Sequence, residues 1–265
     1  MTISHCPLKI SIVTISYNQV AFLEKAILSV IEQDYPNYEY IVVDPGSTDG
    51  SRDIIERYRD RITKIVYEPD CGAADGLNKG FSYATGDIYY FINSDDFLLP
   101  NTVSKIAGYF EADSYLDVLL AGGVRVNENG TIESTFYPSK VSKKSYVNGA
   151  VTFFQQGMFF RSDLFHRVGG FNIQNNTSWD GELLLQFLLA GAKFRRTMDT
   201  IAAFRIYSES ITGSQRLSAQ LKLDHSRMYE LVYGAGQSPL LLTQLYYRAL
   251  KLFADPIYLY KRILG

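Results

Sequence analysis

Two adjacent acids follow a short apolar run in the first half of the chain. Residues 88–92 (IYYFI) are β-branched or aromatic, and the polar residues 93–96 (NSDD) come directly after them. Such a run predicts a buried strand, and ligands of open α/β sheets bind beyond the carboxyl ends of the strands. Asp95 and Asp96, with Asn93 beside them, offer the hard oxygen donors that Mg²⁺ or Mn²⁺ prefers. An Asx-rich turn that caps the next helix explains the same residues without a ligand.

Alternating strands and helices are predicted to position these acids. Apolar runs predict strands at 9–16, 40–44, 62–67 and 87–93, and helical spacing predicts helices at 21–33, about 51–60 and 73–84. This alternation with short links is typical of an α/β fold with a doubly wound, mostly parallel, Rossmann-like sheet. Asp44 ends the second strand, before the turn 45–50. We therefore expect Asp44 and Asp95 at the same edge of the sheet.

The pattern changes after residue 100. We expect a helix at 101–110, a β-hairpin at 118–136, a strand at 153–160, helices at 162–168 and 179–190, and a last strand at 201–206. From residue 214 the chain predicts two or three helices with a turn near 234–239. We therefore divide it into an α/β domain, 1–212, and a C-terminal helical extension, 213–265.

Composition excludes several classes of protein. The 265 residues carry a formal net charge of −2, two cysteines and three histidines. A chain this close to neutral offers no general field for nucleic acid, and two cysteines make neither a disulfide framework nor a metal cluster. The first seven residues lack the pattern of a signal peptide, and no apolar run is long enough to span a bilayer. We expect a cytoplasmic protein with no nucleic-acid partner.

Six motifs carry a resemblance to a known family. In order, they are ISIVTISYNQ, YIVVDPGSTDGS, YEPDCGAADGLNKG, ATGDIYYFINSDD, FFRSDLFHRVGGF and WDGELLLQFLLAGAKF. Over roughly residues 8–210 the chain resembles family 2 glycosyltransferases with the GT-A fold, of the type that builds bacterial surface polysaccharides. The resemblance implies inverting transfer of a sugar from a UDP-, dTDP- or GDP-sugar to a hydroxyl of a saccharide or polyprenyl-linked acceptor. It also implies a nucleotide-sugar half at about 8–100 and an acceptor half at about 101–212.

The resemblance assigns eight residues to the donor site. They are Thr14, Tyr17, Asp44, Asp75, Asn78, Lys79, Asn93 and Asp95. Asp44 can accept hydrogen bonds from a pyrimidine N–H or from ribose hydroxyls, and a buried acceptor discriminates against ligands without that donor. Similar enzymes usually have a second acid where this chain has Pro45. A turn acid at Asp44 and a solvated helix lysine at Lys79 are the simpler interpretations.

The resemblance implies a divalent cofactor, Mn²⁺ or Mg²⁺. Asp95 is the first choice as its ligand, and Asp96 is a second ligand or a contact to ribose or to metal-bound water. The first acid of the family's motif is replaced by Asn93. Tyr207 stands where similar enzymes carry a histidine that completes the metal site. Tyrosine is a poor ligand for Mg²⁺ because its phenol pKa is about 10.

Asp180 aligns with the family's catalytic base. Such a carboxylate lies within hydrogen-bond reach of the acceptor hydroxyl and removes its proton. The preceding glutamate of the family is replaced by Trp179, and Glu182 matches a further acid, so both are acceptor-side candidates. Acids in a first helical turn also complement the helix dipole, and a single tryptophan commonly belongs to a core.

The last residues, 238–265, combine basic and apolar side chains. Arg248, Lys251, Lys261 and Arg262 face a single acid, Asp255, among many Leu, Tyr and Phe residues. This composition suits a peripheral segment on an anionic membrane, here the inner face of the cell membrane, near a lipid-linked acceptor. Packing against the α/β domain, or against a second subunit in a homodimer, explains the same apolar residues.

Two other functions are compatible with such a sheet. A sugar-phosphate nucleotidyltransferase needs a glycine- and basic-rich phosphate loop near the first strand, and residues 16–19 (SYNQ) do not form one. A catalytically silent nucleotide-sugar-binding or scaffold protein with a GT-A fold is suggested by Asn93, Trp179 and Tyr207. The motifs do not determine the donor base, the sugar, the acceptor or the linkage.

Overall fold

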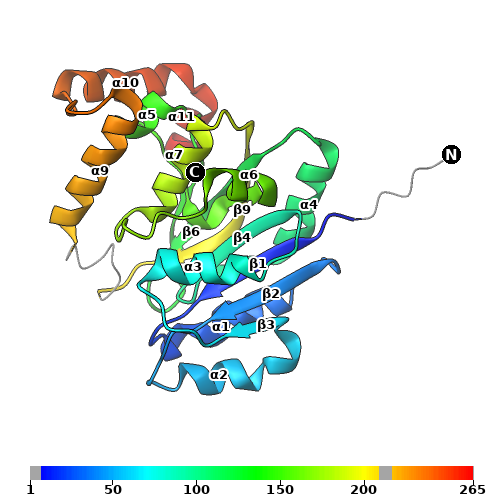
Figure 1. Cartoon of the computed structure of the whole chain (residues 1–265). Helices are drawn as coiled ribbons and strands as arrows, with labels where there is room; N and C mark the ends of the chain where they lie inside the picture. Colours follow the sequence, from blue (N-terminus) through cyan, green and yellow to red (C-terminus); the bar gives the residue numbers. More distant parts are fainter. Residues whose placement is uncertain (1–6, 209–216, 265) are drawn as a thin grey trace.

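One mixed sheet runs through the computed structural model, which describes residues 7–208 and 217–264. Within this part the sheet has nine strands in the order β3-β2-β1-β4-β8-β6-β9-β5, and β7 also pairs with β6 (Figure 1). The strands are β1 Ile10–Ile15, β2 Tyr38–Val43, β3 Lys64–Val66, β4 Ile88–Asn93, β5 Phe97–Leu98, β6 Val118–Val126, β7 Ile132–Phe136, β8 Met158–Arg161 and β9 Phe194–Arg205.

Helices cover both faces of this sheet and extend the chain at its end. The helices are α1 Val20–Ile31, α2 Ser51–Arg57, α3 Ala73–Ser82, α4 Thr102–Ala112, α5 Lys143–Val147, α6 Ser162–Val168, α7 Trp179–Leu189, α9 Ser218–Tyr233, α10 Leu241–Ala254 and α11 Pro256–Leu264. Two short 3₁₀ helices are η1 Arg59–Arg61 and η2 Gln155–Gly157.

The first half of the sheet is parallel, as the alternation of strands and helices predicts. β1 pairs in parallel with β2 and β4, and β3 pairs in parallel with β2. Along β4, Ile88 and Tyr90 pack into the core beside α1 and α4, while Tyr89 and Phe91 pack into the core beside α3, α6 and α7. Because successive strand residues point to opposite faces, this one buried strand contributes side chains to the cores on both sides of the sheet. The expected doubly wound α/β architecture is confirmed.

The second half of the sheet is mixed, and here several predicted boundaries were wrong. β8 pairs antiparallel with β4 and β6, and β9 pairs in parallel with β6. β9 begins at Phe194, not at 201 as predicted. The prediction missed residues 194–200 because they are mostly polar or half-buried and carry no strand pattern. β8 begins at Met158, not at 153, because Gln155–Gly157 form η2. The hairpin of β6 and β7 is confirmed, whereas α5 and the two-residue β5 were not predicted.

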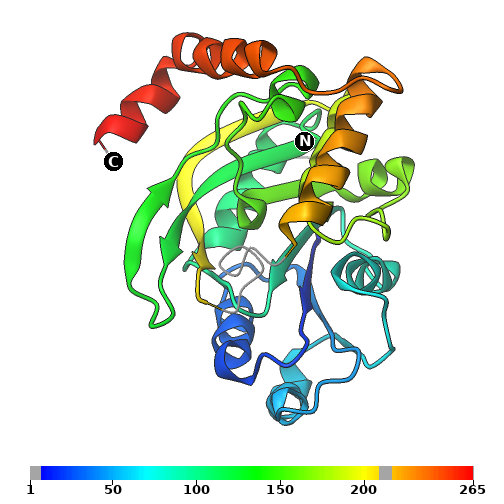
Figure 2. The same cartoon turned by 90° about the vertical axis from the view of Figure 1, so that its left-hand side faces the viewer.

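The C-terminal helices pack beside α5, at one margin of the molecule (Figures 1 and 2). Asp255 accepts hydrogen bonds from Arg196 Nη2 at 2.7 Å and from the Lys140 backbone N–H at 2.9 Å. The predicted helices and the turn between α9 and α10 are confirmed, and the proposed boundary near residue 212 lies outside the described residues. No helix of the described chain combines the length and apolarity needed to cross a membrane.

The contact of α3 with the sheet generates a stability prediction. A Cβ added at Gly80 would lie 2.5 Å from Val13 Cγ1 and 3.0 Å from Val43 Cγ2. We expect Gly80→Ala to lower the free energy of unfolding by about 1–3 kcal/mol, because core overpacking forces side chains or backbone to move. Chemical denaturation of both proteins measures this difference.

Gly108→Ala in α4 is the matched control. No described atom lies within 4 Å of a Cβ placed at Gly108. Alanine has the higher helix propensity, so this variant should gain up to about 1 kcal/mol. Equal effects of the two substitutions would contradict the tight contact of α3 with β1 and β2.

Candidate functional site

A cavity of about 650 Å³ opens at the carboxyl edge of β1, β2 and β4. Parallel strands of α/β sheets place their ligand crevice at this edge. The lining residues come from the strand ends, the loop before α3, the start of α7 and the end of β9: Ile15, Ser16, Tyr17, Gln19, Pro45, Gly46, Pro69, Asp70, Gly72, Ala73, Asn93, Ser94, Asp95, Trp179 and Tyr207. The cavity size suits a ligand larger than a single sugar ring.

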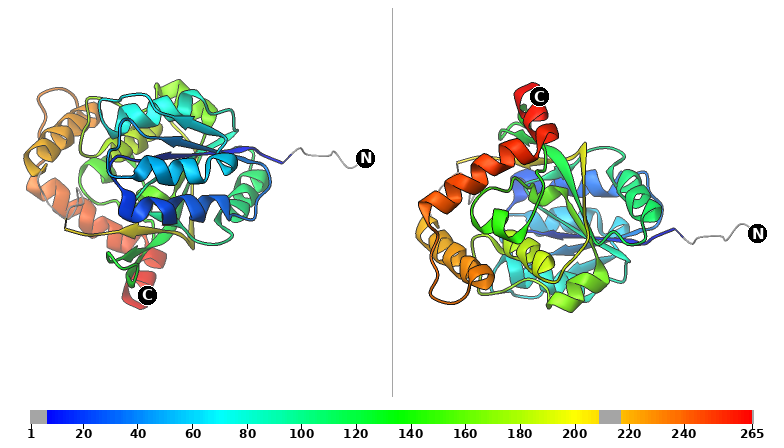
Figure 3. Two further views of the ribbon diagram at one scale, coloured as in Figure 1. Left: turned by 90° about the horizontal axis from the view of Figure 1, so that it is seen from below. Right: turned by 90° about the horizontal axis from the view of Figure 1, so that it is seen from above.

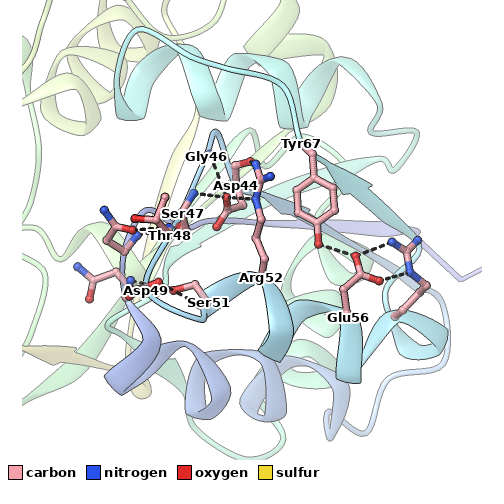
Figure 4. Close-up of polar contacts among 12 residues, drawn as sticks. Asp44, Gly46, Ser47, Thr48, Asp49, Ser51, Arg52, Glu56 and Tyr67 are labelled. Atoms are coloured by element: carbon pink, nitrogen blue, oxygen red, sulfur yellow. Dashed lines mark hydrogen bonds and ion pairs between the residues drawn. The ribbon is translucent and has the colours of Figure 1, made fainter.

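Asp44 lies buried at the end of β2, in the loop that leads to α2 (Figure 4). Its Oδ1 accepts the backbone N–H groups of Gly46 at 3.0 Å and Ser47 at 2.8 Å. Its Oδ2 is buried and has no hydrogen-bond partner within the described chain. Asp44 does not itself line the cavity, but Pro45 and Gly46 directly after it do. Buried carboxylate oxygens are normally paired, so this Oδ2 is a vacant acceptor behind those two residues.

Arg52 holds the Asp44 carboxylate from the side of α2. Arg52 Nε donates to Asp44 Oδ1 at 3.0 Å, and the guanidinium lies 4.5 Å from the centre of the Tyr67 ring. The Tyr67 hydroxyl donates to Glu56 Oε1 at 2.7 Å, which fixes the ring (Figure 4). The Gly46, Ser47 and Arg52 donors all bind Oδ1, and Tyr67 holds Arg52 in place. The protein therefore fixes the orientation of the carboxylate and leaves Oδ2 as its unoccupied oxygen.

Asp96 turns into the protein at the tip of β4. Its Oδ1 accepts the Arg205 backbone N–H at 2.9 Å, and its Oδ2 accepts Gln156 Nε2 at 2.5 Å and Asn93 Nδ2 at 3.4 Å. The side chain is buried, and burial followed by the charge of Asp95 raises the pKa of Asp96. Asp96 does not line the cavity, so the structure argues against its expected role as a metal ligand.

Asp95 points the other way and lines the cavity. Its Oδ2 accepts the Tyr207 hydroxyl at 3.3 Å, and burial raises the pKa of Asp95. Burial, reinforced by the charge of Asp95, raises the pKa of Tyr207 to about 12, so this phenol stays protonated and acts as a donor. Tyr207 therefore lies beside Asp95, where the resemblance leads us to expect a histidine, but it supplies no anionic ligand for a metal.

The donor set at this tip fits a hard divalent cation that is only partly held by protein. Asp95 supplies one carboxylate, and the buried Asn93 Oδ1 has no partner within the described residues. No group of three or more His, Cys, Asp or Glu residues suited to a metal occurs in the described chain. Mg²⁺ and Mn²⁺ commonly take most of their ligands from water and substrate phosphates, which agrees with such a sparse site.

The three α3 residues expected at the donor site, Asp75, Asn78 and Lys79, do not line the cavity. Asn78 Nδ2 donates to the Phe171 carbonyl and its Oδ1 accepts the Phe171 N–H, both at 2.9 Å. Lys79 pairs with Asp75 at 2.9 Å, and Asp75 also accepts the Cys71 N–H. These contacts hold the loop before α3 and join it to the segment after α6, so the structure argues against direct ligand contact by all three.

The same loop contributes Asp70, which begins the segment 70–79 that the resemblance places along the donor pocket, although no individual role was predicted for it. Asp70 lines the cavity, and burial raises its pKa. A Cβ at Gly76 would lie 2.6 Å from Asp70 Oδ2, so the glycine leaves room for this carboxylate. The signal in the sequence is the Asp-Cys-Gly turn before the helix, where an acid and a glycine bring side chain and backbone close together.

Thr14 and Tyr17, the two residues expected from the first strand and the loop after it, differ in their access to the cavity. Thr14 is fully buried and its hydroxyl accepts the Tyr40 hydroxyl at 3.0 Å, so it does not reach the cavity. Tyr17 lines the cavity and is 61% exposed, which leaves its ring free to cover a ligand. Gln19, which was not predicted, also lines the cavity and contacts the Tyr207 hydroxyl at 3.2 Å.

The start of α7 forms one wall of the cavity. Trp179 lines the cavity, with its ring centre 5.4 Å from that of Phe91 and 5.5 Å from that of Phe171. Asp180 follows it, and burial raises the pKa of Asp180 to about 6 despite the nearby backbone N–H groups. A carboxyl with this pKa is poised to accept a proton near neutral pH.

Glu182 is a structural residue of the same helix. It is buried and accepts Asn172 Nδ2 at 2.9 Å, Asn175 Nδ2 at 2.7 Å and Arg227 Nη2 at 2.6 Å. Both carboxylate oxygens are therefore occupied by the segment before α7 and by α9. This argues against its expected contact with an acceptor and assigns Glu182 to positioning the start of α7.

Relatives with known names share this sequence in part. The chain is 24% identical over 240 residues to the uncharacterized glycosyltransferase alr2836 of Nostoc sp., covering 84% of this chain and 74% of that protein. It is 29% identical over 134 residues to the poly(ribitol-phosphate) beta-N-acetylglucosaminyltransferase TarS of Staphylococcus aureus, covering 49% of this chain and 23% of TarS.

Solved structures share the fold. The crystal structure of TarS has a TM-score of 0.67 at 18% identity over 93% of this chain and 44% of TarS, so the present chain spans less than half of that protein. The mannosyltransferase PcManGT from Pyrobaculum calidifontis, solved with GDP-Man and Mn²⁺, has a TM-score of 0.65 at 19% identity over 97% of this chain and 73% of its own. These likenesses confirm the GT-A-type α/β architecture.

The sequence profile of the family described as Glycosyl transferase family 2 matches residues 11–211. This range holds every strand of the sheet except the first residue of β1, together with the whole cavity lining. The expected resemblance is thereby confirmed, and the chain belongs to glycosyl transferase family 2.

Proposed function

We propose that this chain is an inverting glycosyltransferase that moves a sugar from a nucleotide-diphosphate sugar to a hydroxyl of a saccharide or lipid-linked saccharide acceptor, in polysaccharide biosynthesis. The observation that carries the proposal is the cavity at the carboxyl edge of β1, β2 and β4, which Asp95 and Trp179 line, with Asp180 directly after Trp179. Family membership supports a transferase, and TarS has been solved in complex with UDP-GlcNAc.

The nucleotide binds at the β1–β2 side of the cavity in this proposal. The vacant Asp44 Oδ2 accepts an N–H of the base or a ribose hydroxyl, and Tyr17 covers the nucleoside. A buried acceptor that is otherwise unpaired favours ligands that supply the matching donor. Donors of the UDP-, dTDP- and GDP-sugar classes all carry such groups.

The diphosphate lies at the tip of β4, where Asp95 and Asn93 would hold Mn²⁺ or Mg²⁺. Such a cation supplies positive charge that stabilises the departing nucleoside diphosphate. Tyr207 donates to the Asp95 carboxylate, and Arg205 Nε donates to the Asp95 carbonyl at 2.9 Å. These two contacts fix the direction of the carboxylate before any ligand arrives, which lowers the cost of reorganisation during the reaction.

Asp180 acts as the general base. Its carboxylate accepts the proton of the acceptor hydroxyl while the oxygen attacks the anomeric carbon. The bond from that carbon to the diphosphate oxygen breaks, its electron pair leaves with the diphosphate, and the configuration at the carbon inverts. Trp179 presents an aromatic face to the sugar, a common way to bind the apolar side of a saccharide ring.

A catalytically silent nucleotide-sugar-binding protein is the second candidate. The observation that favours it is the Tyr207 hydroxyl, which lies 3.3 Å from Asp95 Oδ2 where similar enzymes are expected to carry a metal-binding histidine. Such a protein would bind the donor through Asp44 and Asp95 and transfer no sugar. The experiments below separate the two candidates.

Substitution of the base tests the mechanism directly. We expect Asp180→Asn to lower kcat by about 10²- to 10⁴-fold, the usual contribution of a general base, with nucleotide affinity unchanged. Donor hydrolysis and sugar transfer measure kcat, and calorimetry measures affinity. Asp163→Asn, an acid in the first turn of α6, is the control and should retain full activity. Unchanged turnover in Asp180→Asn would favour the silent protein.

The pKa of the same group predicts a pH dependence. A base must be deprotonated, so kcat/KM should fall about tenfold per pH unit below the Asp180 pKa. Since burial raises that pKa to about 6, the acidic limb should have its midpoint near pH 6. A midpoint near the ordinary aspartate value, about 4, would contradict the assignment. Residual activity of Asp180→Asn should lack this limb.

Nucleotide binding tests the donor site. We expect one of UDP, GDP and dTDP to bind in calorimetry, and Mn²⁺ to strengthen this binding. Asp44→Asn should weaken it about 10-fold or more, because a buried acceptor is lost. Asp95→Ala should remove the Mn²⁺ enhancement and leave the metal-free affinity nearly unchanged. If Asp95→Ala keeps the full enhancement, the metal does not bind at the tip of β4.

A further inference from the structure

The outer face of α10 and α11 carries uncovered apolar side chains, which we call the apolar stripe. Its residues are each at least half exposed, up to 85% for Phe253: Leu241, Leu242, Leu245, Tyr246, Phe253, Ile257 and Tyr260. In α10 the pairs Leu241/Leu245 and Leu242/Tyr246 are four residues apart and Phe253 follows two turns later, while Ile257 and Tyr260 in α11 are three apart, so each set lies on one side of its helix. Contiguous exposed apolar surface of this kind marks an interaction site.

The opposite face of these helices makes the contacts with the α/β domain. Lys251 Nζ donates to Thr152 Oγ1 at 2.6 Å, Tyr258 is buried, and the Asp255 carboxylate binds Arg196. Packing against the domain, one of the expected explanations for the apolar residues, thus accounts for the inner face alone. Figure 3 shows α10 along the outer margin of the molecule from below and from above.

Basic residues are concentrated in the two chain segments that meet at α10 and α11. Residues 238–265 contain four basic residues and one acid, Asp255, which is buried and paired with Arg196. The neighbouring segment 138–151 contains three lysines and no acid. The two segments meet where the Lys140 N–H binds Asp255 and where Arg248 lies 3.3 Å from a Cβ placed at Gly149. In a chain with a net charge of −2, this is a local concentration of positive charge.

We infer that the apolar stripe and the exposed basic residues Lys143, Lys144 and Arg248 dock the protein on an anionic lipid bilayer. Leu, Tyr and Phe side chains enter the boundary between headgroups and acyl chains, and Lys and Arg contact the anionic headgroups. A second copy of the chain would instead bring two positively charged surfaces together across a symmetric interface, which like-charge repulsion opposes. The lipid surface complements both the apolarity and the charge.

A second cavity lies between α5, α9 and α10, on the inner side of this surface. It has a volume of about 480 Å³, and Arg248, His225 and Tyr146 are among its lining residues. A Cβ placed at Gly181 would lie only 1.9 Å from the Tyr146 hydroxyl, so this wall is adjacent to the residue after Asp180. The docking surface extends the proposed function, on which its purpose rests, because a lipid-linked acceptor would be held beside the base.

Liposome flotation tests the docking. The purified chain is mixed with phosphatidylcholine vesicles, with and without phosphatidylglycerol, at low and high salt. We expect binding to the anionic vesicles that weakens with salt. Leu242→Asp/Phe253→Asp should lower the binding at least about tenfold, because each side chain loses apolar burial. Ile132→Asp, which replaces an exposed apolar residue on β7, is the matched control and should bind as the native chain does.

The charge is tested separately. Lys143→Glu/Lys144→Glu should lower binding to anionic vesicles at least about tenfold, because two attractions to anionic headgroups are replaced by repulsions. Absence of binding to anionic vesicles, or equal binding of the Leu242→Asp/Phe253→Asp variant, would overturn the proposal. So would a dimer in analytical ultracentrifugation that the same double variant dissociates. Calorimetric nucleotide binding without vesicles, measured on every variant, distinguishes loss of docking from misfolding or from failure of the proposed function.

Discussion

The buried carboxylate of Asp96 is the contact on which the site depends. A charge removed from water must be matched by donors, and here those donors come from three separate segments: Arg205 at the end of β9, Gln156 in η2 and Asn93 in β4. Satisfying one carboxylate therefore joins the parallel half of the sheet to the mixed half. Because Asp96 is held inside, its neighbour Asp95 is turned toward the cavity, where Tyr207 meets it.

The parallel half of the fold could be predicted because its signals are local. Runs of β-branched residues define the cores of β1, β2 and β4, and each is long enough to be recognised without its neighbours. The mixed half could not be predicted as well. The polar first half of β9 is ordered by pairing with β6, and the two residues of β5 pair with β9. Tertiary pairing, which the chain order does not reveal, decides those elements.

The site divides in the same way. The positions of Asp44 and Asp95 at the carboxyl edge of the sheet could be predicted because each follows a strand, and strand ends of a parallel sheet converge. The contacts of Asn78 and Glu182 could not be predicted, because their partners are distant along the chain or belong to another helix: the backbone of Phe171 for one, Arg227 for the other. A sequence motif predicts where along a strand or helix a residue lies. Whether its side chain contacts a ligand or its own protein depends on the segment packed against it.

β9 connects the cavity with the C-terminal helices. Near its start, Arg196 binds the buried Asp255 at the junction of α10 and α11. At its end, the Arg205 N–H binds Asp96 beneath the cavity, and the strand is hydrogen-bonded to β6 over most of the length between them. Pairing with β6 fixes both ends of β9 in the sheet, with shifts of the register near Gly122 between them. The same strand therefore supplies one contact to the junction of α10 and α11 and another to the tip of β4, so the C-terminal helices and the cavity are both attached to one element of the sheet.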